Sequence, residues 1–191
     1  MSQRILLVLL VLVVLVLGAC NACPPKGPRA VRIDPAFTEA QALAIADAVD
    51  AWDRIGLTVY VSSWDDADAV PIVRDDSIVT KPIPGYKGRV GLLGLTTVST
   101  KHVGDRVQLA GAGTFANGHT VDQFDFYSTI AHELGHLYGL NSNGDVGADG
   151  HGHSANPDDL MFNGGHAGDP RREISGEDAD RVLGAVDKVW P

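Results

Sequence analysis

The chain is poor in cysteine and in basic residues. Among its 191 residues only Cys20 and Cys23 are cysteines, so no disulfide framework can hold a domain together. Its 15 lysines and arginines are outnumbered by 24 aspartates and glutamates, which gives a formal net charge of −9 at pH 7. A chain this acidic is a poor candidate for binding nucleic acid or for electrostatic attachment to anionic lipid. The sequence also contains no internal repeat and no run of coiled-coil heptads.

Long apolar runs are absent except at the N-terminus. Residues 1–4 are a short basic start and residues 5–17 are uninterrupted and apolar, which is too short for a transmembrane helix and typical of a signal peptide. The closing Leu-Gly-Ala-Cys resembles a bacterial lipobox, whose cysteine is lipid-modified and becomes the mature N-terminus. We therefore expect a signal peptide over residues 1–19, export to the cell envelope (periplasmic or cell-surface), and a lipid anchor on Cys20. The alternatives are an uncleaved anchor, or cleavage without a lipid.

Residues 20–29 are rich in proline and glycine and predict a semi-extended, lipid-anchored tether. Residues 30–191 have the size of one ordinary domain. Alternation of apolar residues and turn signals predict strands over residues 31–34, 57–62, 69–73, 89–99 and 106–110. Apolar residues at helical spacing predict helices over residues 38–55 and 175–190. Thr38 with Gln41, and Ser175 with Asp178, supply helix-capping signals. The last helix is expected to dock on the core through Val182, Leu183, Val186 and Val189.

The strongest signal for function is His132-Glu133-Leu134-Gly135-His136. Two histidines four residues apart lie about 40° apart around a helix, so both imidazoles can grip one metal ion. Glu133 points to the flank, where its carboxylate can act as a base on a water held by that ion. Ile130, Leu134 and Leu137 give an apolar stripe at helical spacing, Asp125 or Ser128 can cap the start, and Gly139 can end the helix (residues around 125–139).

A catalytic zinc ion usually takes three protein ligands, so a third must follow. The stretch H-E-L-G-H-L-Y-G resembles the metzincin signature H-E-x-x-H-x-x-G-x-x-H, but Ser142 occupies the place of its last histidine. Residues 153–161, H-S-A-N-P-D-D-L-M, resemble the matrixin branch of that family. The resemblance implies that His153 is the third zinc ligand, that Met161 forms the Met-turn beneath the metal, and that residues 140–152 contain a surface insertion. His151 and Asp145 remain alternatives to His153.

The resemblance implies an α+β metzincin-like zinc protease domain. Its elements are a twisted, mostly parallel sheet with an antiparallel edge strand, an active-site helix, the Met-turn and a C-terminal helix. The activity expected is that of a zinc-dependent endopeptidase, with Glu133 as general base. A protein or peptide substrate would bind along an edge strand within residues 92–98, in a pocket walled by residues 162–166 that includes His166. We expect a monomer.

Other interpretations remain open at this stage. Asn143, Asp145 and Asp149 alternate with glycines and admit a Ca²⁺ ion, although their spacing is not an EF-hand and suits a plain loop better. The substrate can be cell-wall peptide bridges instead of proteins. The chain can also be a non-catalytic lipoprotein that binds a metal or a partner on a protease scaffold. In a gluzincin-like arrangement the third ligand would be a glutamate such as Glu173 or Glu177.

Overall fold

The computed structural model describes residues 30–81, 91–142, 144–163, 168, 170 and 173–190. The expected signal peptide, the tether with Cys20, and also Asn143 and His166, lie outside these residues and stay predictions. None of the helices in the described ranges is long and apolar enough to cross a membrane.

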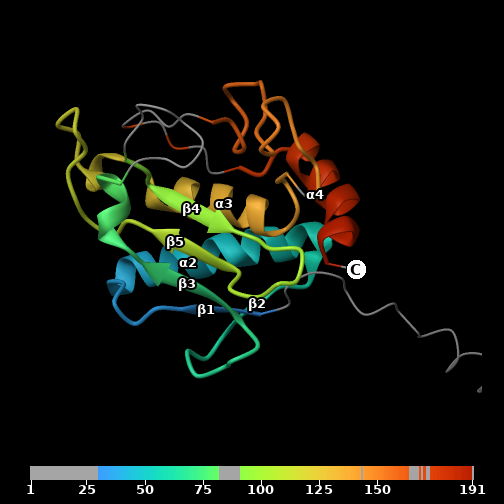
Figure 1. The fold of residues 1–191 in the computed structure, drawn as a ribbon, viewed down its shortest axis with the longest axis horizontal. Coiled ribbons are helices and arrows are strands. Elements are labelled where there is room, and N and C mark those ends of the chain that lie inside the picture. Colours follow the sequence, from blue (N-terminus) through green and yellow to red (C-terminus); the bar gives the residue numbers. More distant parts are fainter. Residues whose placement is uncertain are drawn as a thin grey trace, which may run out of the picture.

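A single five-stranded sheet organises the described chain (Figure 1). The strands lie in the order β2-β1-β3-β5-β4, and only the pairing of β4 with β5 is antiparallel. This arrangement confirms the predicted α+β class with a mostly parallel sheet and an antiparallel edge strand. The bounds of the strands are β1 Ala30–Ile33, β2 Tyr60–Ser62, β3 Val70–Arg74, β4 Gly94–Thr97 and β5 Arg106–Leu109.

Two of the predicted strands are shorter than expected by more than one residue. The strand expected over residues 57–62 begins only at Tyr60, because a π-helical turn (η1, Asp53–Leu57) runs through Leu57 and Thr58 adopts a left-handed φ of 56°. The strand expected over residues 89–99 is limited to β4, and residues 89 and 90 lie outside the described ranges. Two short 3-10 helices, η2 (Asp76–Val79) and η3 (Val121–Gln123), were not expected.

Helix α2 (Glu39–Trp52) follows β1 and begins at the expected capping box. The Thr38 hydroxyl accepts from the Gln41 backbone at 3.3 Å, and the Thr38 backbone donates to the Gln41 side chain at 3.1 Å. Its buried face consists of Ile45, Ala48, Val49 and Trp52.

Helix α3 (Phe126–Leu137) lies beside α2, and both helices cover the same face of the sheet (Figure 1). The Trp52 indole of α2 donates to the Ala131 carbonyl of α3 at 2.9 Å, which fixes the two helices together inside the core. The same helix also packs against β4 and β5. The predicted histidine-bearing helix therefore runs along the β4 end of the sheet.

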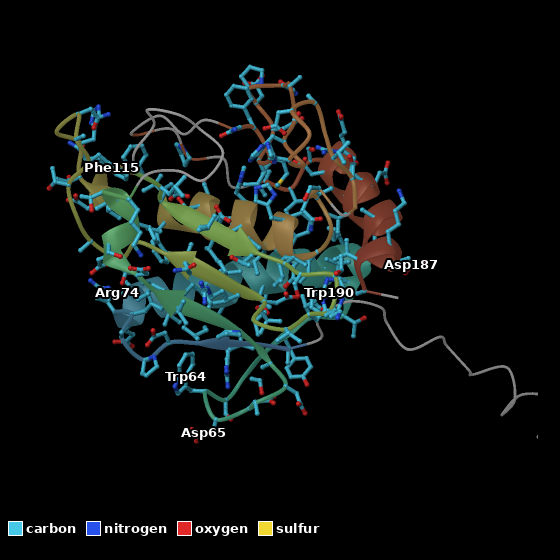
Figure 2. All side chains as sticks on the ribbon, in the orientation of Figure 1. Trp64, Asp65, Arg74, Phe115, Asp187 and Trp190 are labelled. Carbon is cyan, nitrogen blue, oxygen red and sulfur yellow. The ribbon has the colours of Figure 1, made fainter. Side chains whose placement is uncertain are left out.

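Helix α4 (Gly176–Val189) closes the described chain, and the Ser175 hydroxyl caps it by accepting from the Asp178 backbone at 3.0 Å. Val182, Val186 and Val189 are buried as expected, but Leu183 is 45% exposed and that prediction was wrong. Leu183 is one residue, about 100° of helix rotation, beyond Val182, and the small Ala185 fills the core position instead. Beyond the helix, Trp190 (labelled in Figure 2) donates to the Leu137 carbonyl at 3.0 Å. Its ring stacks on His102 from the β4–β5 loop.

Candidate metal centre

Helix α3 brings His132 and His136 together on one face. Its first turn is capped by Asp125, whose carboxylate accepts from the Ser128 backbone at 2.8 Å; of the two predicted caps, Asp125 is the one used. The Nε2 atoms of His132 and His136 are 3.0 Å apart. The helix ends at Leu137, and Gly139 follows with a φ of 124°, a left-handed conformation that favours glycine and turns the chain away from the helix axis.

His153 completes a group of three histidines. One ring nitrogen from each of His132, His136 and His153 lies within 4.8 Å of the others, and the group can hold a metal ion. All three side chains are half-buried, which leaves the cluster reachable from solvent. The histidine that was predicted as the third ligand, His153, is therefore the one that the tertiary structure places beside the helix.

The alternative ligands lie elsewhere. His151 is exposed, and the Asp145 carboxylate accepts from the Arg181 guanidinium at 2.9 Å. Glu173 and Glu177 are exposed, and neither belongs to the histidine group. Among the described residues, no other group of histidine, cysteine or acidic side chains is gathered closely enough to hold a metal ion, and the predicted Ca²⁺ ion stays a prediction.

Each histidine of the group has an acceptor at Nδ1. His132 faces the Leu160 carbonyl at 2.8 Å, His136 the Leu140 carbonyl at 2.5 Å, and His153 the Asp149 carboxylate at 2.5 Å. A carbonyl or a carboxylate can only accept, so each Nδ1 donates its hydrogen. In the neutral rings the lone pair then resides on Nε2, which is the tautomer that a metal ligand needs. No sequence pattern predicts these three partners.

Burial is the main factor that favours neutral imidazole at His153. Burial and the neighbouring His136 lower the pKa of His153, and Asp149 opposes that shift only in part. Partial burial by itself raises the pKa of Asp149, but hydrogen bonds from the His151 backbone and the His153 side chain outweigh it and bring the pKa down to about 2. Asp149 therefore stays ionised at neutral pH and can hold the His153 ring in its ligand tautomer.

The donor set fits a cation. With both Nδ1 atoms donating, the Nε2 atoms of His132 and His136 face each other at 3.0 Å with two lone pairs. Two acceptors at this separation repel each other unless a positive charge is shared between them. A metal ion bound by His132, His136 and His153 satisfies all three Nε2 atoms at once.

Glu133 lies on the side of α3 that faces the edge strand. The Thr96 hydroxyl of β4 lies 2.7 Å from Glu133 Oε2 and 2.9 Å from the Glu133 carbonyl, so it donates to one of them at a time. A side chain at Gly94 would come within 2.5–2.8 Å of the Glu133 side chain, so only glycine leaves room for it. Glu133 is 7% exposed, and this burial raises its pKa although His136 and Thr96 act in the opposite direction.

Met161 lies beneath helix α3. It is fully buried, and its sulfur fills the space that a side chain at Gly135, between the two helix histidines, would occupy. The backbone of Ser154 donates to the Met161 carbonyl at 2.8 Å, so the segment after His153 folds back under α3. The assignment of Met161 to a Met-turn stays a prediction. Of the expected pocket wall over residues 162–166, only Phe162 and Asn163 are described.

Comparison with known proteins identifies no family for this chain. No protein-family model matches the chain, and no curated protein sequence matches it. The candidate metal centre consequently rests on the residues themselves, namely three histidines with outer acceptors and a buried glutamate beside them.

Proposed function

We propose that the chain is a zinc-dependent endopeptidase of the metzincin type, in its matrixin-like branch. The observation that carries the proposal is the cluster of His132, His136 and His153 with Glu133 adjacent to it on the same helix. The order of sheet, histidine helix, methionine turn and final helix along the chain supports the same family. We further propose that the protein acts outside the cytoplasm, anchored through Cys20.

Zinc is the metal that this donor set suits best. His132, His136 and His153 would hold it through three imidazole nitrogens, which is a known ligand set for catalytic zinc with a position left for substrate or water. Two nitrogens bound to one tetrahedral zinc ion lie about 3.3 Å apart, close to the 3.0 Å between the Nε2 atoms of His132 and His136. When bound, zinc supplies Lewis-acid polarisation of the scissile carbonyl and lowers the pKa of the attacking water.

Glu133 is the residue that moves the proton. Its carboxylate takes a proton from the attacking water and delivers it to the leaving amine. Its burial favours the uptake of that proton from water, because a desolvated carboxyl group holds a proton more readily than an exposed one. The Thr96 hydroxyl restricts the carboxylate to a single region between β4 and α3.

Strand β4 is the proposed substrate-binding edge. It is the terminal strand of the sheet order, pairs with β5 on one side and runs beside the metal-binding helix. An extended peptide can add to such an edge through main-chain hydrogen bonds. The substrate is then a protein or peptide in extended conformation, and the requirement for an accessible backbone favours unfolded segments.

The test is to compare wild type, Glu133→Gln and His153→Ala, each as the full-length chain purified in detergent. Zinc content is measured by elemental analysis after dialysis, and peptidase activity on an unfolded protein and on purified cell-wall peptide. Wild type is expected to retain about one zinc ion per chain and to cleave the unfolded protein. Glu133→Gln should keep the zinc ion and lose activity by about 10²–10⁴-fold, the usual contribution of general acid–base catalysis.

The outcomes separate the alternatives. His153→Ala should lose both zinc and activity; zinc retained in this variant would move the third ligand to another residue. Cleavage of the cell-wall peptide alone would change the substrate class but not the chemistry. Undiminished activity of Glu133→Gln would remove the proposed mechanism, and wild-type protein without zinc or activity would favour a non-catalytic lipoprotein.

A further inference from the structure

The segment between helix α3 and His153 is tied down along its length. The Asp145 backbone donates to the Gly139 carbonyl at 2.8 Å, the Gly152 backbone to the Val146 carbonyl at 2.7 Å, and the Ala148 backbone to the His153 carbonyl at 2.8 Å. In addition, Gly147 and His153 form an isolated β-bridge. These bonds join both ends of the segment to its middle, so it behaves as an organised structure and not as a plain flexible loop.

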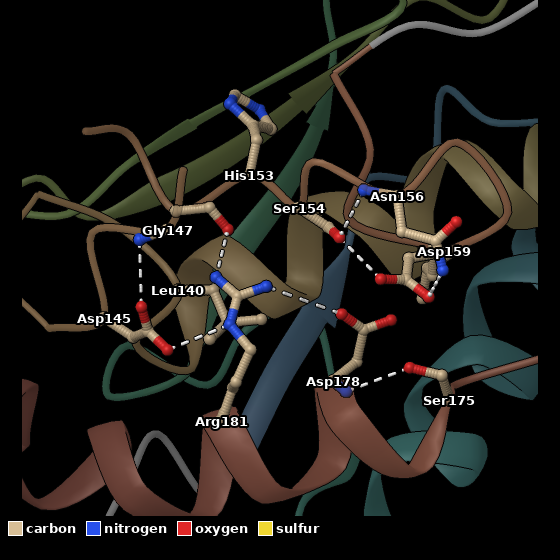
Figure 3. Close-up of polar contacts among 12 residues, drawn as sticks. Leu140, Asp145, Gly147, His153, Ser154, Asn156, Asp159, Ser175, Asp178 and Arg181 are labelled. Atoms are coloured by element: carbon tan, nitrogen blue, oxygen red, sulfur yellow. Dashed lines mark hydrogen bonds and ion pairs between the residues drawn. The ribbon is translucent and has the colours of Figure 1, made fainter. Parts of the chain in front are cut away.

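A single side chain from another element spans this segment (Figure 3). The Arg181 guanidinium of α4 donates through Nε to the Asp145 carboxylate at 2.9 Å and through a terminal nitrogen to the Gly152 carbonyl at 2.9 Å. Its other terminal nitrogen lies 3.8 Å from the Asp178 carboxylate, one helical turn earlier in α4. The Arg181 side chain is only 15% exposed, so water screens these contacts weakly.

The two contacts of Arg181 lie near the two ends of the segment that leads from α3 to His153. Asp145 stands near the start of the segment, and Gly152 is the residue directly before His153. A planar guanidinium fork holds both acceptors in one fixed relative position, which the single ammonium group of lysine does not reproduce. Because the carbonyl of Gly152 is fixed, the backbone that carries His153 is fixed as well.

We propose that Arg181 is a positioning residue for the metal centre: it holds the segment of residues 145–152 against α4 so that His153 stands in ligand position before the metal arrives. The inference rests on the proposed metal-binding function. Without Arg181, metal binding would have to order this segment, and the entropy of ordering would be subtracted from the affinity. Outer partners of metal ligands typically contribute about 10–100-fold in metal affinity, and we expect a loss of that size.

The experiment measures metal binding by the full-length chain in detergent, with Co²⁺ and Zn²⁺ as probes. The visible absorption of bound Co²⁺ reports the ligand number, and competition with a chromophoric chelator gives the Zn²⁺ affinity. The variants are Arg181→Gln and Arg181→Lys, with Arg54→Ala as the control that removes one exposed arginine far from the segment in sequence. Arg181→Gln should bind Zn²⁺ about 10–100-fold more weakly, Arg181→Lys should recover part of the loss, and Arg54→Ala should match wild type.

A purely structural role is separated by two further measurements on the metal-free protein. Thermal unfolding should show Arg181→Gln folded, and hydrogen exchange should be faster at the amides of residues 145–153 with no change in α3. If Arg181→Gln does not fold, Asp145→Asn serves in its place, because it removes only the charged acceptor of one contact. Unchanged Zn²⁺ affinity in the folded variant would overturn the positioning role and leave the proposed function intact. A wild-type chain that binds neither ion would overturn both.

Discussion

The two halves of the candidate metal centre are built in different ways. His132, Glu133 and His136 belong to one turn of α3, and their mutual placement follows from helix geometry and a spacing of four residues. His153 and Met161 belong to an irregular segment whose shape depends on contacts with residues distant in the sequence, among them Arg181. The helical half is therefore specified locally, whereas the loop half is specified by tertiary contacts.

This difference indicates where each half is vulnerable. A substitution near the helical half can leave the metal bound and still disturb the chemistry, because the helix holds its two histidines regardless. A substitution in the loop half acts first on the third ligand, so its primary effect should be on metal affinity. Variants in each half, compared for metal affinity and for turnover, test whether the two halves differ in this way.

The largest expected effect is in the loop half, at Asp149. Asp149→Asn keeps the size of the side chain but replaces the anionic acceptor that faces His153 Nδ1 at 2.5 Å. We expect zinc affinity to fall by about 10–100-fold, with peptidase activity restored when excess zinc is supplied. Competition against a chelator measures the affinity. Asp158→Asn, at an exposed position of the same segment, is the control; equal affinity in Asp149→Asn and wild type would contradict the role assigned to Asp149.

An effect of comparable size but of a different kind, on turnover and not on metal affinity, is expected at Thr96, next to the helical half. Thr96→Val removes the hydroxyl that donates to Glu133 at 2.7 Å and keeps the shape of the side chain. Loss of a hydrogen bond to a charged group costs roughly 1.5–3 kcal/mol, so kcat should drop by at least about tenfold with zinc content and KM unchanged. Thr96→Ser should restore turnover. A lower zinc content in Thr96→Val, or no rescue by serine, would show that Thr96 does not act through Glu133.

The smallest effect concerns the pH dependence of stability, and it centres on Asp178 beneath the loop half. Asp178 is fully buried, neither of its carboxylate oxygens has a hydrogen-bond partner within the described ranges, and Arg181 approaches only to 3.8 Å. Burial raises the pKa of Asp178 above its ordinary value of 3.8, with the nearby Asp159 acting in the same direction.

A raised pKa in the folded state means that the protonated form of Asp178 stabilises the fold. This contribution is complete below the unfolded-state pKa of 3.8 and is lost as the pH rises through the folded-state pKa. Asp178→Asn lacks this titration, so its free energy of unfolding relative to wild type should be higher at pH 8 than at pH 4. Urea unfolding with a metal chelator present measures the difference; an identical difference at the two pH values would contradict the assignment.

Much of the fold was predictable because its signals are local. The capping box at Thr38, the cap at Ser175 and the alternation in β5 each involve residues within a few positions of one another, and the structure confirms all three. The errors occurred where local signals compete with packing. Leu183 has the hydrophobicity of a core residue, but the helix rotation set by Val182 and Val186 turns it to solvent.

The candidate site was only partly predictable. His153 was chosen because its neighbourhood resembles a known motif, and the structure brings it to the helix histidines. No sequence pattern predicts the roles of Asp149, Thr96 and Arg181, because each role depends on a contact with one particular atom in the folded chain. The sequence pattern suggests Asp149 only as a calcium ligand, and Asp145 as a ligand of calcium or of the catalytic metal. In the structure Asp149 faces the His153 ring, and Asp145 accepts from Arg181.

The sequence alone determined the chemistry that the protein can attempt, because two histidines and a glutamate at helical spacing create half of a metal site wherever that helix forms. Tertiary structure decided whether a third ligand, His153, would lie close to these two histidines. It placed His153 beside the two helix histidines and buried Glu133 against β4. It also set the tautomers of the three rings, because the Leu160 and Leu140 carbonyls and the Asp149 carboxylate accept from their Nδ1 atoms. These contacts join residues separated by four to 37 positions, and the longer of them exist only when the whole core has assembled.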